Sequence, residues 1–203
     1  ATVYDLKPEV LEAVQEWEDT YLAGRIAKGR LTEEQVAETR SRFHLEPSLE
    51  KAVQGVDCVI RTAAVHDDNP EIAAARAAGI PVFERAEAWG ALMRHYENAL
   101  CVSGTHGKTT TTSMMTHILM EAQADPTVMI GGYLPLLRAG HRVGNGDTIL
   151  LESCEYCDSF LNFFPTLAVI LNVEADHLDY FKDLADVQKS FKAFAKLSSG
   201  GVL

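Results

Sequence analysis

The chain has 203 residues, of which 47% are hydrophobic and 23% charged, so it can bury one or two cores of ordinary size as a globular protein. Its net charge of −11 and pI near 5.0 disfavour nucleic acid or an anionic membrane as the main partner, so any affinity for phosphate must be local. No apolar run approaches the roughly 20 residues of a membrane span, and the first residues do not resemble a signal peptide, so we expect a cytoplasmic protein. The sequence gives no indication of an oligomeric state.

Strands and helices are predicted to alternate along the first half of the chain. Thr32 and Gln35 have the spacing of a capping box, which predicts a helix running to about Phe43. Asn69 and Pro70 open another helix, which ends near Gly79. The other predicted elements are strands at 2–4, 56–60 and 81–83 and helices from Pro8 to about Ala23, after Ser48, and over 86–96. This alternation predicts an α/β fold with a parallel sheet covered by helices.

The second half continues the alternation. Strands are predicted at 99–103, 127–130, 148–151 and 167–171, and helices at 109–122 and 184–197. Gly131 and Gly132 are predicted to form a turn, and the glycine-rich segment 138–147 a loop. Because Ala1 leads directly into one strand and residues 200–203 resemble the start of another, we expect a fragment of a longer protein.

A glycine-punctuated turn between the strand 99–103 and the helix 109–122 predicts a nucleotide-phosphate site. Its residues are Gly104, Thr105, His106, Gly107, Lys108, Thr109 and Thr110. Glycines let the backbone curl so that several N–H groups point at one oxyanion, and the helix adds the positive end of its dipole. Lys108 would bring a charge to the β- and γ-phosphates of ATP, and the Thr109 hydroxyl could ligate the bridging Mg²⁺.

The spacing of this turn leaves an alternative open. The pattern G-x-x-G-K-T is two residues shorter than the common phosphate-loop pattern G-x-x-x-x-G-K-[ST], so a bare match would be weaker support. The alternative is a glycine-rich strand-to-helix turn that binds nothing.

Two further candidate residues follow predicted strands. Glu152 comes directly after the strand 148–151, and His177 follows the strand 167–171 a few residues later. Ligands of open parallel sheets bind beyond the carboxyl ends of the strands, where the phosphate loop also lies. We therefore predict Lys108, Glu152 and His177 as catalytic residues and Thr109, Glu152 and His177 as ligands of Mg²⁺. Taken singly, Glu152 is also compatible with an exposed acid and His177 with a hydrogen-bonded loop histidine.

The cysteines offer another chemistry. Cys154 and Cys157 have the spacing of half a zinc site or of a redox pair, but no second pair follows them. Together with Cys58 and Cys101, they fit buried or free thiols of a reducing compartment.

Four segments together resemble the Mur ligases, and within that family the members that add L-alanine. They are 104–112 (GTHGKTTTT), 68–71 (DNPE), 152–160 (ESCEYCDSF) and 172–179 (NVEADHLD). The similarity covers about residues 56–203, and His106 within the loop is the feature that resembles the L-alanine-adding members.

The resemblance implies an ATP-dependent reaction that joins L-alanine to the lactyl carboxylate of UDP-N-acetylmuramate, in the synthesis of peptidoglycan precursors. The carboxylate would attack the γ-phosphate to give an acyl phosphate, which the alanine amine would then displace. Such a reaction between anions needs positioning and charge neutralisation more than covalent help from the protein. The resemblance also implies that the segment 62–69, with His66 and Asn69, borders the pocket for the UDP-sugar.

Residues 1–55 instead resemble the NAD-binding domain of 3-hydroxyacyl-CoA dehydrogenases, in which an acid matching Asp5 ends the second strand and binds the adenosine ribose. An engineered fusion, a recombined gene and an assembly artefact would all produce such a mosaic. We thus predict an incomplete Rossmann-like domain over 1–98, dehydrogenase-like over 1–55 and Mur ligase-like over 56–98. A truncated Mur ligase central domain with a P-loop NTPase-like fold follows over 99–203.

Three hypotheses about function follow. The first is an ATP-dependent ligase fragment that is poorly active alone, the second an NAD-binding dehydrogenase-like fragment, and the third a non-catalytic nucleotide-binding module. The ligase hypothesis is supported by residues 56–203. For this fragment we expect phosphate binding rather than full catalysis.

Overall fold

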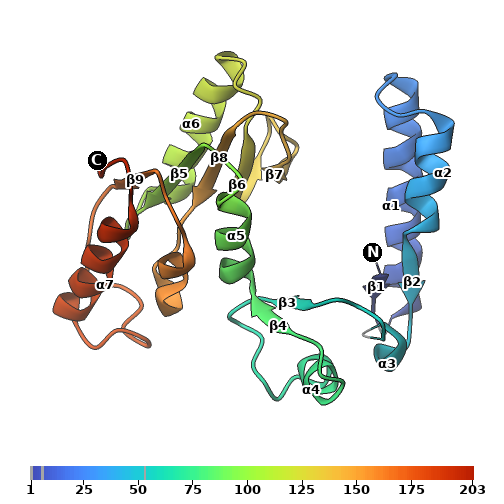
Figure 1. Ribbon diagram of the computed structural model, residues 1–203, viewed down its shortest axis with the longest axis horizontal. Coiled ribbons are helices and arrows are strands. Elements are labelled where there is room, and N and C mark those ends of the chain that lie inside the picture. Colours follow the sequence, from blue (N-terminus) through green and yellow to red (C-terminus); the bar gives the residue numbers. More distant parts are fainter. Residues whose placement is uncertain (1, 6, 53) are drawn as a thin grey trace. The chain divides into compact units, whose positions relative to one another are not determined.

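The structure is a computed structural model that describes residues 2–5, 7–52 and 54–203 (Figure 1). The chain forms two compact units that divide between Phe83 and Glu84. This division lies earlier than the predicted boundary between residues 98 and 99. The helix α5 (Arg85–Met93) is the reason, since it contributes Ala86 and Met93 to the core of the second unit.

The first unit begins with a strand, two helices and a second strand. The strand β1 (Thr2–Tyr4) pairs in parallel with β2 (His44–Glu46), a short strand that the sequence pattern does not predict. Between them lie α1 (Pro8–Ala27) and α2 (Glu33–Ser41). The helix α1 extends beyond its predicted end near Ala23 and ends before Gly29, which has a φ of 64°.

The predicted capping box of α2 is confirmed. Thr32 Oγ1 accepts a hydrogen bond from the Gln35 N–H at 3.2 Å, and Gln35 Oε1 accepts one from the Thr32 N–H at 2.9 Å. These two bonds satisfy donors that a helix start otherwise leaves unpaired.

The rest of the first unit keeps the strand–helix alternation. It consists of α3 (Leu49–Ala52), β3 (Val59–Arg61), α4 (Pro70–Ala77) and β4 (Val82–Glu84). In the described part of this unit, β1 with β2 and β3 with β4 make two separate two-stranded sheets. Asn69 caps α4 as predicted, since its Oδ1 accepts the Glu71 N–H at 2.9 Å.

The second unit contains a five-stranded sheet in the order β7-β6-β8-β5-β9. Its strands are β5 (Asn98–Ser103), β6 (Thr127–Leu134), β7 (Ala139–Arg142), β8 (Thr148–Glu152) and β9 (Leu167–Ile170). The pairs β5–β8, β5–β9 and β6–β8 are parallel, and β6–β7 is antiparallel. The predicted parallel sheet is therefore confirmed, with an antiparallel strand added at one edge.

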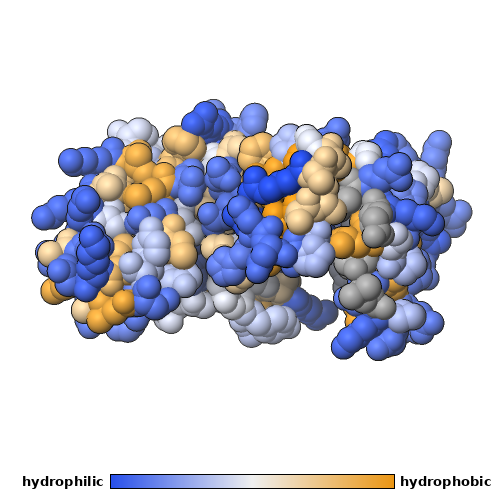
Figure 2. Space-filling model, turned by 90° about the horizontal axis from the view of Figure 1, so that it is seen from below, coloured by the Kyte–Doolittle hydropathy of each residue, from blue (hydrophilic) through white to orange (hydrophobic). Residues whose placement is uncertain are grey.

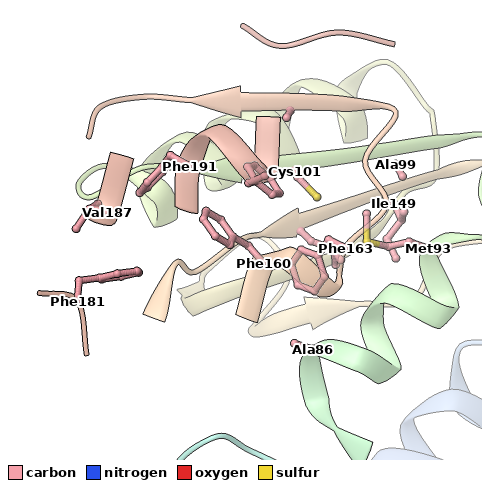
Figure 3. Close-up of a cluster of buried hydrophobic side chains, with 13 residues drawn as sticks. Ala86, Met93, Ala99, Cys101, Ile149, Phe160, Phe163, Phe181, Val187 and Phe191 are labelled. Carbon is pink, nitrogen blue, oxygen red and sulfur yellow. The ribbon is translucent and has the colours of Figure 1, made fainter. Parts of the chain in front are cut away.

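Helices cover both faces of this sheet, because side chains of the buried strands alternate between two cores. On one face, Met115 and Leu119 of α6 (Lys108–Glu121) pack against Leu150 and Val102. On the other face, α5, the 3-10 segment η1 (Tyr156–Asn162) and α7 (Leu184–Leu197) surround a larger core. Figure 3 shows Phe160 of η1 at its centre beside Phe191. The predicted phosphate loop, residues 104–110, thus follows a strand that is buried between two packed layers.

Two predictions in this unit were wrong. The strand β6 does not turn at Gly131 and Gly132 but runs through both glycines to Leu134. The segment 138–147, predicted as a loop, contains β7, in which His141 lies opposite Met129. Near the other edge, Val202 forms a parallel bridge with Ala168, in agreement with the strand start predicted at 200–203.

None of the helices in the described residues is both long enough and apolar enough to span a membrane. The longest, α1, has 20 residues but carries acidic side chains along its length, among them Glu12, Glu16 and Asp19. On the face that Figure 2 shows, hydrophobic residues form scattered patches among hydrophilic ones.

Candidate functional site

The predicted phosphate loop joins β5 to α6, and both of its glycines are required by the backbone. Gly104 has a φ of 140° and Gly107 a φ of 84°, conformations that residues with a Cβ rarely adopt. A Cβ at Gly104 would also lie 3.1 Å from Leu171 Cβ and 3.2 Å from Asn172 N. Because Gly107 is the N-cap of α6, the unpaired N–H groups and the positive dipole end of this helix are directed at the loop.

Asn172, just after β9, fixes the shape of the loop. Its Oδ1 accepts the His106 N–H at 2.8 Å, and its Nδ2 donates to the His106 carbonyl at 3.0 Å. Its own carbonyl accepts the Thr105 N–H at 3.1 Å. The Thr105 hydroxyl accepts the Glu174 N–H at 2.8 Å, so two successive loop residues are tied to the segment after β9. The His106 ring is exposed, and its Nε2 lies 3.8 Å from Glu174 Oε2.

Lys108 lies inside the loop and is paired with a buried acid. Its Nζ donates to the carbonyls of Gly104 at 2.5 Å and Thr105 at 3.2 Å. It also lies 3.0 Å from Glu155 Oε2 and 3.3 Å from Oε1. Glu155 is only 1% exposed, so this ammonium replaces the water that its carboxyl group would otherwise contact. Glu155 was not among the predicted site residues, and the sequence pattern did not predict this contact.

Thr109 contacts Glu152, in line with the predicted convergence of the loop after β5 and the carboxyl end of β8. The Thr109 hydroxyl donates to Glu152 Oε1 at 2.8 Å, and the Gly131 N–H donates to Oε2 at 2.6 Å. A Cβ at Gly131 would lie 2.7 Å from Glu152 Oε1. The glycine in β6 therefore makes room for this carboxylate rather than for a turn.

His177 lies close to two acids, Glu155 and Asp176. Glu155 is the same residue that pairs with Lys108. Ligand atoms of Glu155, Asp176 and His177 all lie within 4.8 Å of one another, and His177 Nε2 is 4.0 Å from Glu155 Oε1. The backbone of His177 is strained, with a φ of 51°, and its ring contacts that of Tyr156 at 4.9 Å between centroids. His177 thus connects to the phosphate loop through Glu155, whereas Thr109 and Glu152 contact each other directly.

The predicted substrate residues belong to the first unit. His66 is exposed, and its carbonyl accepts the Asn69 N–H at 3.1 Å. The side-chain oxygen of Asn69 is engaged as the cap of α4.

The cysteines show no sign of metal chemistry in the described part of the chain. All four are free thiols, and the group of possible metal ligands in the described residues contains none of them. Burial raises the pKa of Cys154 and Cys157, and it raises the pKa of Cys101 to about 12. Such thiols stay protonated near neutral pH and are poor nucleophiles.

Comparison with known proteins identifies related sequences along most of the chain. The family model of the Mur ligase middle domain matches residues 102–203, and the model of the Mur ligase family catalytic domain matches residues 35–97. The chain is 49% identical over 154 residues to the UDP-N-acetylmuramate–L-alanine ligase of Agathobacter rectalis, covering 76% of this chain and 34% of that protein. The corresponding ligase of Lachnospira eligens is 52% identical over 149 residues, covering 73% and 32%. The chain spans about a third of the length of the curated relatives it matches.

Two solved structures are similar to this chain. The crystal structure of UDP-N-acetylmuramate-alanine ligase MurC from Thermotoga maritima has a TM-score of 0.68 at 29% identity, covering 87% of this chain and 44% of that one. A ligase for UDP-N-acetylmuramate and L-alanyl-gamma-D-glutamyl-meso-diaminopimelate from Neisseria meningitides shares the fold, with a TM-score of 0.65 at 22% identity.

These matches bear on the predicted mosaic. The catalytic-domain model begins at residue 35, inside the segment 1–55 for which the sequence predicts a dehydrogenase-like origin. The dehydrogenase resemblance of residues 1–34 stays a prediction. The middle-domain model covers half of the chain and contains the phosphate loop, Glu152, Glu155 and His177. The chain therefore belongs to the Mur ligase family.

Proposed function

We propose that the chain carries the ATP-binding part of a ligase that joins L-alanine to UDP-N-acetylmuramate. Its relatives from Agathobacter rectalis and Thermotoga maritima are named for this reaction. The observation that carries the proposal is the pairing of Thr109 with Glu152 at the mouth of a phosphate loop that encloses Lys108. A glycine-rich turn without a ligand would have no need of these three groups together.

The loop supplies the contacts that a triphosphate needs. The first N–H groups of α6 would bind phosphate oxygens, and the helix dipole favours their negative charge. The ammonium of Lys108 would neutralise charge between the β- and γ-phosphates, where a point charge is most useful. Bonds from Asn172 hold His106 in place, so the cradle is formed before the nucleotide arrives.

The donor set suits Mg²⁺, which prefers hard oxygen ligands and keeps several waters. Thr109 and Glu152 would hold a magnesium ion against the phosphates. His177, with help from Glu155 and Asp176, would hold a second cation. When bound, these ions would neutralise the charge that builds up on the transferred phosphoryl group.

In this proposal the protein contributes positioning and charge rather than a covalent intermediate. The lactyl carboxylate of UDP-N-acetylmuramate would attack the γ-phosphate, forming a C–O–P linkage as the bond to ADP breaks. The alanine amine would then form the amide and release phosphate. We place this reaction in the cytoplasm, where ATP is available and the four cysteines remain reduced.

We also propose that His66 and Asn69 contact the UDP-sugar. Because the cap of α4 occupies the side-chain oxygen of Asn69, its amide nitrogen is the group that it would offer. The exposed ring of His66 would supply a second polar contact.

Calorimetric titration of ATP and Mg²⁺ into the 203-residue chain tests the proposal. Lys108→Ala should weaken binding by about tenfold or more, because hydrogen bonds to charged groups contribute about 1.5–3 kcal/mol. The matched control is Lys192→Ala, which removes the same charge from an exposed position on α7 and should bind as the unchanged chain does. Thermal unfolding of each variant shows that it is folded. Equal affinity of Lys108→Ala and the unchanged chain would refute the proposal.

A further inference from the structure

The ammonium of Lys108 has no proton free for a phosphate. An ammonium carries three protons. Two are used inside the loop, on the carbonyls of Gly104 and Thr105. The third is directed at Glu155, whose two carboxylate oxygens lie 3.0 and 3.3 Å from Nζ. A phosphate in the loop must therefore compete with Glu155 for this proton.

Glu155 is a strong competitor because water does not screen the pair. The side chain of Glu155 is 2% exposed and that of Lys108 is 14% exposed. A buried carboxylate needs a charged or hydrogen-bonding partner, and losing its partner is costly. Among the described residues, the other cationic candidate is His177, whose Nε2 at 4.0 Å is beyond hydrogen-bond distance.

From this geometry we infer that Glu155 is a positioning residue that sets nucleotide affinity by competing with phosphate for Lys108. The inference rests on the proposed function, because it takes the phosphate loop to be a nucleotide site. Without nucleotide, Glu155 keeps Lys108 in one conformation within the loop. Each binding event separates this pair, so Glu155 lowers the affinity for nucleotide in the absence of metal.

Calorimetric titration of ATP in EDTA tests the inference, since EDTA removes divalent cations from the comparison. Glu155→Gln keeps the shape of the side chain but releases the ammonium, and it should bind ATP about tenfold more tightly, equivalent to about 1.4 kcal/mol. Removing the negative charge of any acid beside the loop would also tighten ATP binding, because that charge repels phosphate. Glu174→Gln controls for this, because Glu174 is an exposed acid beside His106 that does not contact Lys108. Its affinity should change by about twofold or less, as expected for a screened surface charge.

A double-mutant cycle distinguishes positioning from a structural role. If Glu155 acts through Lys108, Glu155→Gln should not change ATP affinity in a Lys108→Met background. Lys108→Met leaves a buried carboxylate unpaired, so its folding is checked by thermal unfolding. If Lys108→Met does not fold, the variant Glu155→Asp is used in place of the double-mutant cycle. That variant keeps the charge but withdraws the carboxylate by one methylene group, and it should still tighten ATP binding.

The outcomes separate the inference from the proposed function. Glu155→Gln binding ATP no more tightly than the unchanged chain would overturn the inference alone, as would equal gains for Glu155→Gln and Glu174→Gln. An unchanged chain that binds no ATP, with or without Mg²⁺, would overturn both.

Discussion

Replacing Asn172 by alanine should release the phosphate loop from the segment that follows β9. The side chain of Asn172 makes two hydrogen bonds to the His106 peptide, at 2.8 and 3.0 Å. Each such bond has a net value of about 1 kcal/mol, so the variant should lose about 2 kcal/mol from the loop. The backbone bond from the Thr105 N–H to the Asn172 carbonyl does not depend on the side chain and should remain.

This loss sets the expected change in affinity. If the released loop no longer binds phosphate, a loss of about 2 kcal/mol corresponds to roughly 30-fold weaker ATP binding. If the loop still adopts its binding conformation part of the time, the loss of ATP affinity should be smaller. The assay is ATP titration together with amide hydrogen exchange at residues 104–107, which should become faster. Asn162→Ala is the matched control, because that side chain donates to Ser159 O within η1 and not to the loop. Unchanged affinity and unchanged exchange in Asn172→Ala would refute the reasoning.

Three further predictions concern single side chains. Gly104→Ala should lower the free energy of unfolding by about 1–3 kcal/mol in urea, because φ is 140° and the Cβ would crowd the Asn172 backbone. A loss no larger than that of Gly24→Ala, where φ is negative and the Cβ meets nothing within 4 Å, would argue against it. Thr109→Val should abolish the gain in ATP affinity that Mg²⁺ provides and leave the affinity in EDTA unchanged, whereas Thr109→Ser should restore the gain; a full Mg²⁺ effect in the valine variant would contradict the metal assignment. Burial raises the pKa of Cys101 from 9.0 to about 12, so the folded chain retains a proton that the unfolded chain loses. The stability this thiol contributes is thus fully present below pH 9 and lost between pH 9 and about 12. Urea unfolding of Cys101→Ala should show a flatter pH dependence there, and an identical slope would count against the burial of the thiol.

The sequence was sufficient to predict the glycine turn between β5 and α6, because the residues that build it are contiguous. It also predicted that Glu152 would meet the loop. That prediction needed only parallel strands, since residues at their carboxyl ends share one edge. In the structure, β5 and β8 are neighbours and Val102 lies opposite Glu152, which brings the carboxylate to Thr109.

The glycines of β6 were predicted wrongly because two different physical causes favour glycine. Local pattern suggests a turn at Gly131 and Gly132, but Gly131 is required by the approach of the Glu152 carboxylate. The strand β7 was missed for the same reason, since its glycine also indicates irregular structure by local pattern. A Cβ at Gly140 would lie 2.8 Å from the Gly132 carbonyl, so the glycines follow from strand contacts that single-sequence patterns do not contain.

Glu155 could not be distinguished from its acidic neighbours by sequence alone. Glu174 and Asp179 are exposed, whereas Glu155 is buried against Lys108. Glu155 lies in the short segment between β8 and η1, and η1 itself bends through left-handed residues at Cys157 and Asp158. Neither residue is a glycine, so no sequence signal marks that bend.

A crystal structure of the chain with Mg²⁺ and a non-hydrolysable ATP analogue would test the central claim most directly. We expect the β- and γ-phosphates at the start of α6 and a magnesium ion about 2.1 Å from Thr109 Oγ1 and a Glu152 oxygen. We also expect Lys108 Nζ to contact phosphate and no longer Glu155. Phosphates bound away from the loop, or a metal that Thr109 and Glu152 do not touch, would contradict the account.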